Sequence, residues 1–194
     1  AIMTSQHFEQ RVGVYVDVQN MYYSAKNLYN AKVNFANILK AVVGKRRLVR
    51  ATAYVIKADI EEQDKFFNAL RQMGFHVRAK DLQTFMGGAK KGDWDVGIAM
   101  DMIEQAPKLD AVILVSGDGD FQSLLQHLRS ALGCVVEVAA FGKSTSKKLG
   151  EEADSFLDLD DRRFLIAPTK RSAAPHARRP TTPVKKADPP NLKK

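Results

Sequence analysis

Short apolar runs alternate along the chain with longer stretches whose apolar positions recur at helical spacing. Runs rich in Val and Ile are typical of buried strands, and apolar residues three and four positions apart are typical of amphipathic helices. The pattern predicts strands at residues 12–18, 49–56, 76–80, 111–116, 135–140 and 156–159, and helices at residues 21–29, 35–43, 61–73, 93–105, 121–131 and 146–152. This alternation indicates an α/β fold with three layers, in which helices cover both faces of a parallel sheet.

The order of the strands follows from the handedness of their connections. Right-handed crossovers predict the order 3-2-1-4-5 in a Rossmann-like sheet, and the short sixth segment is a candidate for an edge strand. The order reverses between the first and fourth strands, and open α/β sheets bind ligands at such a reversal, beyond the carboxyl ends of the strands. We therefore expect the ligand site where these two strands end.

Composition divides the chain into one domain and a tail. With 194 residues, 45% of them hydrophobic, the chain can bury one sizeable core. We expect an N-terminal extension at residues 1–10, the domain at residues 11–161, and a disordered tail at residues 162–194. The tail holds six of the seven prolines and ten Lys and Arg residues against one acidic residue, a balance of +9, so residues 1–161 carry −1 of the chain's net charge of +8. Such a tail either contacts nucleic-acid phosphates, solubilises the chain, or mediates contact with a protein partner or a second copy.

Cysteine usage and hydropathy indicate where the protein works. Cys134, the single cysteine, lies in an apolar run and is expected to be a buried hydrophobic residue rather than a disulfide or metal ligand. No apolar stretch has the length needed to span a bilayer, and the N-terminus lacks the pattern of a signal peptide. We expect a cytoplasmic protein without a membrane partner.

Acidic side chains lie near the strand ends that are predicted to meet. Asp17 ends the first strand, where a buried carboxylate is costly unless it is paired or bound to a cation. Asp118 and Asp120 follow the fourth strand, and Asp93 and Asp95 begin the helix that precedes that strand. We expect these carboxylates to share one pocket.

Each acidic group also has a structural explanation when it is taken alone. Asp118, Asp93 or Asp95 can cap a helix, a role that contributes about 1 kcal/mol. Their convergence is harder to explain this way, because two like charges about 4 Å apart repel by about 4 kcal/mol at an effective dielectric constant near 20. A cation removes this cost, and a site made only of oxygen ligands favours Mg²⁺ or Mn²⁺ over zinc or copper. Such a site suits hydrolysis of phosphodiester bonds.

Four motifs occur in order along residues 11–160. They are YVDVQN at residues 15–20, KGDWDV at 91–96, VSGDGDF at 115–121, and AFG at 140–142 followed by EAD at 152–154. In this order they resemble the NYN domain family, relatives of the PIN-like nucleases. The resemblance implies a PIN-like fold and a metal-dependent endoribonuclease, with catalytic and metal-binding roles for the matching positions Asp17, Asp95, Asp118 and Asp120.

Four further residues are expected to support this site. Asn20 matches the family's Asp-x-x-Asn element and is expected to orient a water or a phosphate; its alternative role is to cap the first helix. Asp93, Asp101 and Ser116 are placed around the acidic cluster. Asp93 alternatively caps its helix, and Asp101 alternatively pairs with a basic side chain.

Basic and hydroxyl side chains are candidates for holding RNA, which we expect to be single-stranded. They are Lys45, Arg46, Arg47, Lys90, Lys91, Lys143 and Ser144, all in predicted loops or beside helix starts. Side chains of this kind contact backbone phosphates, although solvated loops or a helix cap explain them as well. The competing hypothesis for the whole chain is a noncatalytic module of the same fold that binds RNA or a nucleotide in assembly or regulation. No motif separates the two hypotheses.

Overall fold

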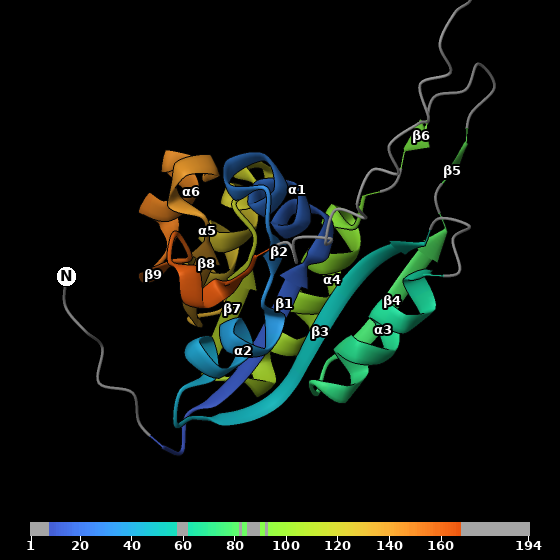
Figure 1. Cartoon of the computed structure of the whole chain (residues 1–194). Helices are drawn as coiled ribbons and strands as arrows, with labels where there is room; N and C mark the ends of the chain where they lie inside the picture. The colour runs from blue at the N-terminus through green and yellow to red at the C-terminus, as the bar shows by residue number, and fades with distance from the viewer. Residues whose placement is uncertain (1–7, 58–61, 82, 85–89, 92, 168–194) are drawn as a thin grey trace, which may run out of the picture.

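The central element of the structure is a six-stranded parallel sheet (Figure 1). A computed structural model describes residues 8–57, 62–81, 83–84, 90–91 and 93–167. The strands run in the order β4-β3-β1-β7-β8-β9, and each adjacent pair is parallel. Their bounds are β1 (Arg11–Asp17), β3 (Arg47–Lys57), β4 (His76–Asp81), β7 (Ala111–Val115), β8 (Val135–Ala140) and β9 (Ser155–Asp158). The predicted α/β class is confirmed, and the sixth predicted strand lies at the edge.

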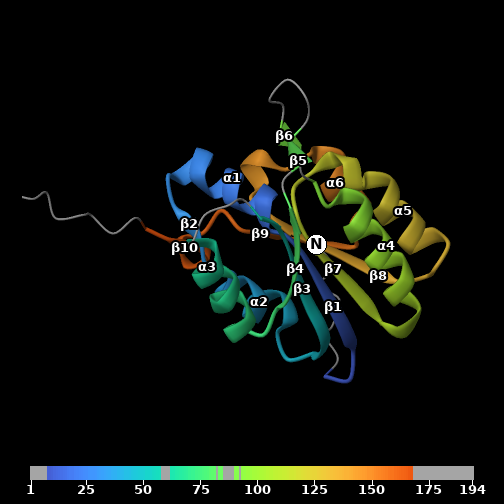
Figure 2. The ribbon, with the colours of Figure 1, turned by 90° about the vertical axis from the view of Figure 1, so that its right-hand side faces the viewer.

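Two layers of helices enclose this sheet. One face carries α1 (Val18–Tyr29), α2 (Phe35–Val43) and α3 (Glu62–Gln72), and the other carries α4 (Asp95–Gln105), α5 (Gln122–Ser130) and α6 (Lys147–Glu152), as Figure 2 shows. Short 3-10 helices η1 (Ala106–Lys108), η2 (Gly119–Phe121), η3 (Gly142–Ser144) and η4 (Arg162–Phe164) lie in the connections. In the part of the chain that the structure describes, no helix is long and apolar enough to cross a membrane.

The core lies on both faces of β1 and β7. All five residues of β7 are buried, as are six of the seven residues of β1. A central parallel strand has helices over both faces, so its sequence is a continuous apolar run rather than an alternation. Asp17 is the polar exception in β1, and its position at the strand's last residue places it at the edge of this core.

Four short strands were not predicted from the sequence. They form two small sheets, β2 (Lys32–Val33) with β10 (Leu165–Ile166), and β5 (Gln83–Thr84) with β6 (Lys90–Lys91). Strands of two residues carry too little periodicity to be recognised from sequence.

The first of these small sheets corrects the predicted start of the tail at residue 162. Phe164 is completely buried, its carbonyl accepts a hydrogen bond from the Asn34 amide, and β10 continues the chain to Ile166. Folded structure therefore extends past residue 161, because one aromatic side chain in this basic segment reaches the core. The remainder of the predicted tail, residues 168–194, lies outside the described residues, as do residues 1–7 of the predicted extension.

Candidate metal centre

Asp17 is held in place at the carboxyl end of β1. It is the N-cap of α1, and its Oδ1 accepts a hydrogen bond of 3.1 Å from the Asn20 amide. Its Oδ2 accepts a second bond of 3.2 Å from the Ser116 hydroxyl, which is buried at the end of β7. Burial raises the pKa of Asp17, and the nearby Asp118 carboxylate adds to this, while the two hydrogen bonds act in the opposite direction. The carboxylate is thus fixed in direction in a place that disfavours its charge.

The loop after β7 brings the next two carboxylates to the same place. The Asp118 amide donates to Ser116 Oγ at 3.2 Å, and Asp118 Oδ1 in turn accepts from the Asp120 amide at 3.0 Å. The Gly117 amide donates to Asn20 Oδ1 at 3.0 Å, so the side chain of Asn20 ties this loop to α1. Gly117 has no room for a side chain, because a Cβ there would lie 2.9 Å from Thr145 Oγ1.

Asp95 completes the cluster from the first turn of α4. Asp95, Asp118 and Asp120 each offer a carboxylate oxygen, and these oxygens lie within 4.8 Å of one another. Partial burial, together with the charges of Asp118 and Asp17, raises the pKa of Asp95 to about 6. Asp17 lines the same pocket, although it is not part of the three-carboxylate group.

These donors suit a divalent cation that prefers oxygen ligands. Three acidic oxygens at such short separations repel one another when they are ionised. A bound Mg²⁺ or Mn²⁺ would remove this repulsion, and carboxylates are the ligands these ions take in proteins. The residues therefore fit the metal that the sequence predicts.

A pocket of about 350 Å³ opens beside these acidic groups. Besides Asp17, Asp95 and Asp118 it is lined by Asp93, Trp94, Gln19, Asn20, Tyr23, Ser24, Asn27, Leu28 and Ser144. Several of these come from one side of α1, where Asn20, Ser24 and Asn27 follow one another at helical spacing. Ser24 and Asn27 were not predicted from the sequence, although their polar side chains continue from Asn20 at helical spacing, which is a signal that the sequence contains. No Lys or Arg is among the described residues that line the pocket.

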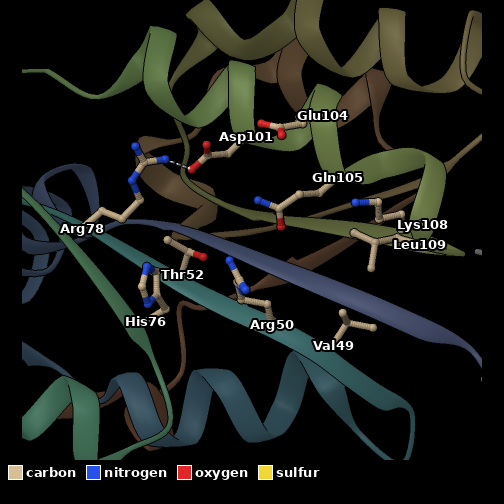
Figure 3. Close-up of a pocket in the computed structure, with 10 residues that line it drawn as sticks. All are labelled: Val49, Arg50, Thr52, His76, Arg78, Asp101, Glu104, Gln105, Lys108 and Leu109. Atoms are coloured by element: carbon tan, nitrogen blue, oxygen red, sulfur yellow. Dashed lines mark hydrogen bonds and ion pairs between the residues drawn. The ribbon is translucent and has the colours of Figure 1, made fainter.

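Among the supporting residues, Asn20, Ser116 and Asp93 lie at this pocket or bond to its carboxylates. Asp101 lies elsewhere. It accepts a hydrogen bond of 2.6 Å from the Tyr54 hydroxyl and forms an ion pair with Arg78 (Figure 3). The alternative expectation for Asp101, pairing with a basic side chain, is the one that the structure shows.

The predicted RNA-binding residues do not form one surface. Arg47 pairs with Arg11 at the amino end of β1, whereas the acidic pocket lies at the carboxyl end, about 20 Å away at the rise of a strand. Arg46 is buried and its guanidinium bonds both carboxylate oxygens of Glu137, at 2.7 and 2.8 Å, so the expectation that it binds phosphate is wrong. Lys45 is exposed beside it.

The other predicted RNA contacts lie nearer to the pocket. Ser144 lines it, and its hydroxyl bonds the Ser24 hydroxyl at 3.0 Å. The exposed Lys143 donates to the Tyr29 hydroxyl at 3.1 Å. The side chains of Lys90 and Lys91 lie outside what the structure describes.

Comparison with known proteins agrees with this fold. The sequence matches the model of the NYN domain over residues 11–160. The low amplitude and bright protein LabA of Synechococcus elongatus is 27% identical over 176 residues, which cover 83% of this chain and 90% of the relative. The solved structure of a protein of unknown function from Vibrio parahaemolyticus is 36% identical and superposes with a TM-score of 0.77, covering 84% of this chain and 100% of the other.

Proposed function

The chain belongs to the NYN domain family, and from that premise we propose that it is a metal-dependent endoribonuclease acting on single-stranded RNA. The observation that carries the proposal is the group formed by Asp95, Asp118 and Asp120, whose oxygens lie within 4.8 Å of one another at the strand reversal of a PIN-like sheet. This is the position where open α/β sheets bind their ligands.

The cofactor of the proposed reaction is Mg²⁺ or Mn²⁺, held by Asp95, Asp118 and Asp120, with Asp17 beside them. When bound, such an ion activates water and stabilises charge on the phosphoryl oxygens. No basic side chain lines the pocket among the described residues. The pocket without its cation therefore repels a phosphate, and RNA binding at this place depends on the ion.

The protein's own groups orient the reacting parts. Ser116 and the Asn20 amide fix the direction of the Asp17 carboxylate, and Asn20 also holds the loop that carries Asp118. Positioning of this kind lowers the entropic cost of reaching the transition state. Asn20 and Ser116 are thus proposed as positioning residues, whereas the aspartates are proposed as catalytic residues.

The side of the pocket formed by α1 is proposed to receive the RNA strand. Tyr23, which is 51% exposed, offers a ring on which an unpaired base can stack. Ser24, Asn27 and Ser144 offer hydrogen bonds to sugar and phosphate oxygens. These groups are neutral, as is suitable for a site where the bound cation balances the phosphate charge.

The competing function is a noncatalytic module of the same family that binds RNA or a nucleotide. The experiment that separates the two measures cleavage and binding of a labelled single-stranded RNA, with Mn²⁺ and with chelator. The variants are Asp118→Asn and the matched control Asp64→Asn, an exposed aspartate on α3. We expect cleavage by the parent and the control with Mn²⁺, and a loss of cleavage in Asp118→Asn or with chelator.

Two results would contradict the nuclease proposal. Cleavage that persists in Asp118→Asn and in chelator assigns the activity to something other than this pocket. Metal-dependent RNA binding without cleavage in the parent supports the noncatalytic module.

A further inference from the structure

A second cleft lies between the sheet and α4, on the side of α4 that faces β3 and β4 (Figure 3). It has a volume of about 460 Å³, within the range that small-molecule sites occupy. Its strand side carries Arg50, Thr52 and His76, and its helix side carries Gln105 and Lys108. None of the proposed metal ligands lines it, so it is separate from the acidic pocket.

The strand side of the cleft is shaped by an irregularity in β3. Val12 pairs with Leu48, but Gly13 pairs with Arg50, so Val49 is an extra residue in β3. Neighbouring residues of a regular strand point to opposite faces, yet Val49 and Arg50 both line the cleft. Bulges that redirect a side chain are common beside functional sites. Arg50 and Thr52, two residues apart, share this face by the regular alternation of the strand, and the bulge adds Val49 beside them.

The charges in the cleft are not balanced within it. Arg78 and Asp101 neutralise each other in an ion pair. Arg50 and Lys108 are exposed and have no hydrogen bond or ion pair to any other described residue. In Figure 3 both basic groups point toward the centre of the cleft, where the Gln105 amide also lies, while Glu104 lies at the rim on α4. The centre therefore presents hydrogen-bond donors to whatever enters.

One donor is oriented by a contact with the core. The Tyr15 hydroxyl donates to Gln105 Oε1 at 3.1 Å, which leaves the side-chain amide nitrogen of Gln105 as a donor for other partners. An anion with several acceptor oxygens satisfies the two cations and this amide together, and a phosphate group has that number and charge of oxygens. Val49 and Leu109 lie at one end of the cleft and supply apolar contact for the rest of such a molecule.

We propose that this cleft binds a small phosphate-bearing molecule of about the size of a nucleoside monophosphate, with its phosphate held by Arg50, Lys108 and Gln105. Thr52 and Glu104 are placed to bond hydroxyl groups of the same ligand. No Phe, Tyr or Trp lines the cleft among the described residues, so a bound RNA strand finds there no aromatic ring larger than the imidazole of His76 on which to stack a base.

The test titrates the full chain, in chelator, with adenosine monophosphate, ribose phosphate and inorganic phosphate, and follows heat of binding by calorimetry. Chelator removes metal-dependent binding at the acidic pocket, so the result does not depend on the nuclease proposal. The variants are Arg50→Gln and Lys108→Gln, and the matched control is Arg47→Gln, an exposed arginine on the same strand that does not line the cleft. All three replace exposed side chains and preserve the core.

We expect saturable binding of at least one phosphate compound by the parent and by Arg47→Gln, weakened about tenfold in Arg50→Gln and in Lys108→Gln because each loses a charge-assisted hydrogen bond. Absence of saturable binding for all three compounds overturns the proposal. Binding that both variants retain at full strength shows that the phosphate compound does not bind in this cleft, and the proposal is then wrong. A third arm titrates a short single-stranded RNA; if the variants weaken RNA binding alone, the cleft is an RNA contact and the small-molecule proposal is wrong.

Discussion

Two aspartates of α4, one at its start and one in its middle, lie in opposite electrostatic surroundings. Asp95, in the first turn, faces two other carboxylates, and its pKa is raised to about 6. Asp101, further along the same helix, meets the guanidinium of Arg78 and the hydroxyl of Tyr54. One aspartate is placed where its charge is costly, and the other where its charge is satisfied. This difference agrees with the proposed role of Asp95 as a metal ligand and with a structural role for Asp101.

The largest effect that tests this contrast is on cleavage. Asp95→Asn is expected to reduce Mn²⁺-dependent RNA cleavage by about 100-fold or more, because it removes a proposed metal ligand. Asp101→Asn retains a side-chain oxygen for the Tyr54 hydroxyl and is expected to change cleavage by only a few-fold. Single-turnover rates at saturating Mn²⁺ measure both. Equal losses in the two variants would remove the distinction between these two aspartates of α4.

The free energy of unfolding is expected to depend on Asp101, whereas cleavage is expected to depend on Asp95. Asp101→Ala is expected to lower the free energy of unfolding by about 2 kcal/mol, chiefly because the buried Tyr54 hydroxyl loses its acceptor. Arg78 is 40% exposed and can turn to water, so its share of the loss is smaller. Thermal unfolding should show a decrease in Tm of about 4 to 8 °C. An unchanged Tm would mean that water replaces the lost acceptor.

Removing a charge from the acidic cluster is expected to increase the free energy of unfolding rather than to decrease it. In chelator, Asp95→Asn should raise the stability of the protein by about 1 kcal/mol, because it removes a partly buried charge and its repulsion from Asp118 and Asp17, in a site that solvent partly screens. With saturating Mn²⁺ the order should reverse, since the parent then gains binding energy that the variant lacks. The measurement is Tm under both conditions. A variant that is less stable than the parent in chelator would show that the charge of Asp95 does not destabilise the folded protein.

The smallest expected effect concerns a surface pair away from both sites. Three hydrogen bonds from Arg11 lower the pKa of Asp110 to about 2. A lowered pKa in the folded state means that the stabilisation is present above the ordinary pKa and is lost as the pH falls toward 2. Asp110→Asn should therefore lower Tm slightly, by under about 2 °C, at pH 6, and the difference should shrink as the pH falls from about 4 through the folded pKa of about 2. A difference that does not shrink over this range would assign it to something other than the charge of Asp110.

Much of the fold followed from the sequence, because long apolar runs and helical spacing are local signals. Strand order then placed Asp17 beside the loop of Asp118, and the structure shows them linked through Ser116. Asp95 and Asp120 were predicted mainly from the family resemblance, since nothing local shows where a helix start lies in space. The structure brings them to the cluster, while their catalytic roles remain a proposal.

The predictions that were wrong or missing concern features that the local sequence does not determine. Arg46 belongs to a basic run, and a run of charges does not reveal which member turns inward to meet Glu137, a residue 91 positions away. The start of the tail was misplaced because β10 owes its order to a distant pairing with β2. The cleft beside β3 was missed because a bulge leaves no mark on the pattern of apolar positions.

The bond between the Asn20 side chain and the Gly117 amide joins residues 97 positions apart. Because β1 lies between β3 and β7, the chain must close this large loop before the acidic loop meets α1. Contacts of such separation form slowly, since the entropy of loop closure is lost before they are made. The acidic cluster is therefore expected to assemble late in folding, and a nascent chain that ends before β7 carries Asp17 and Asp95 but lacks the loop that completes the proposed metal site.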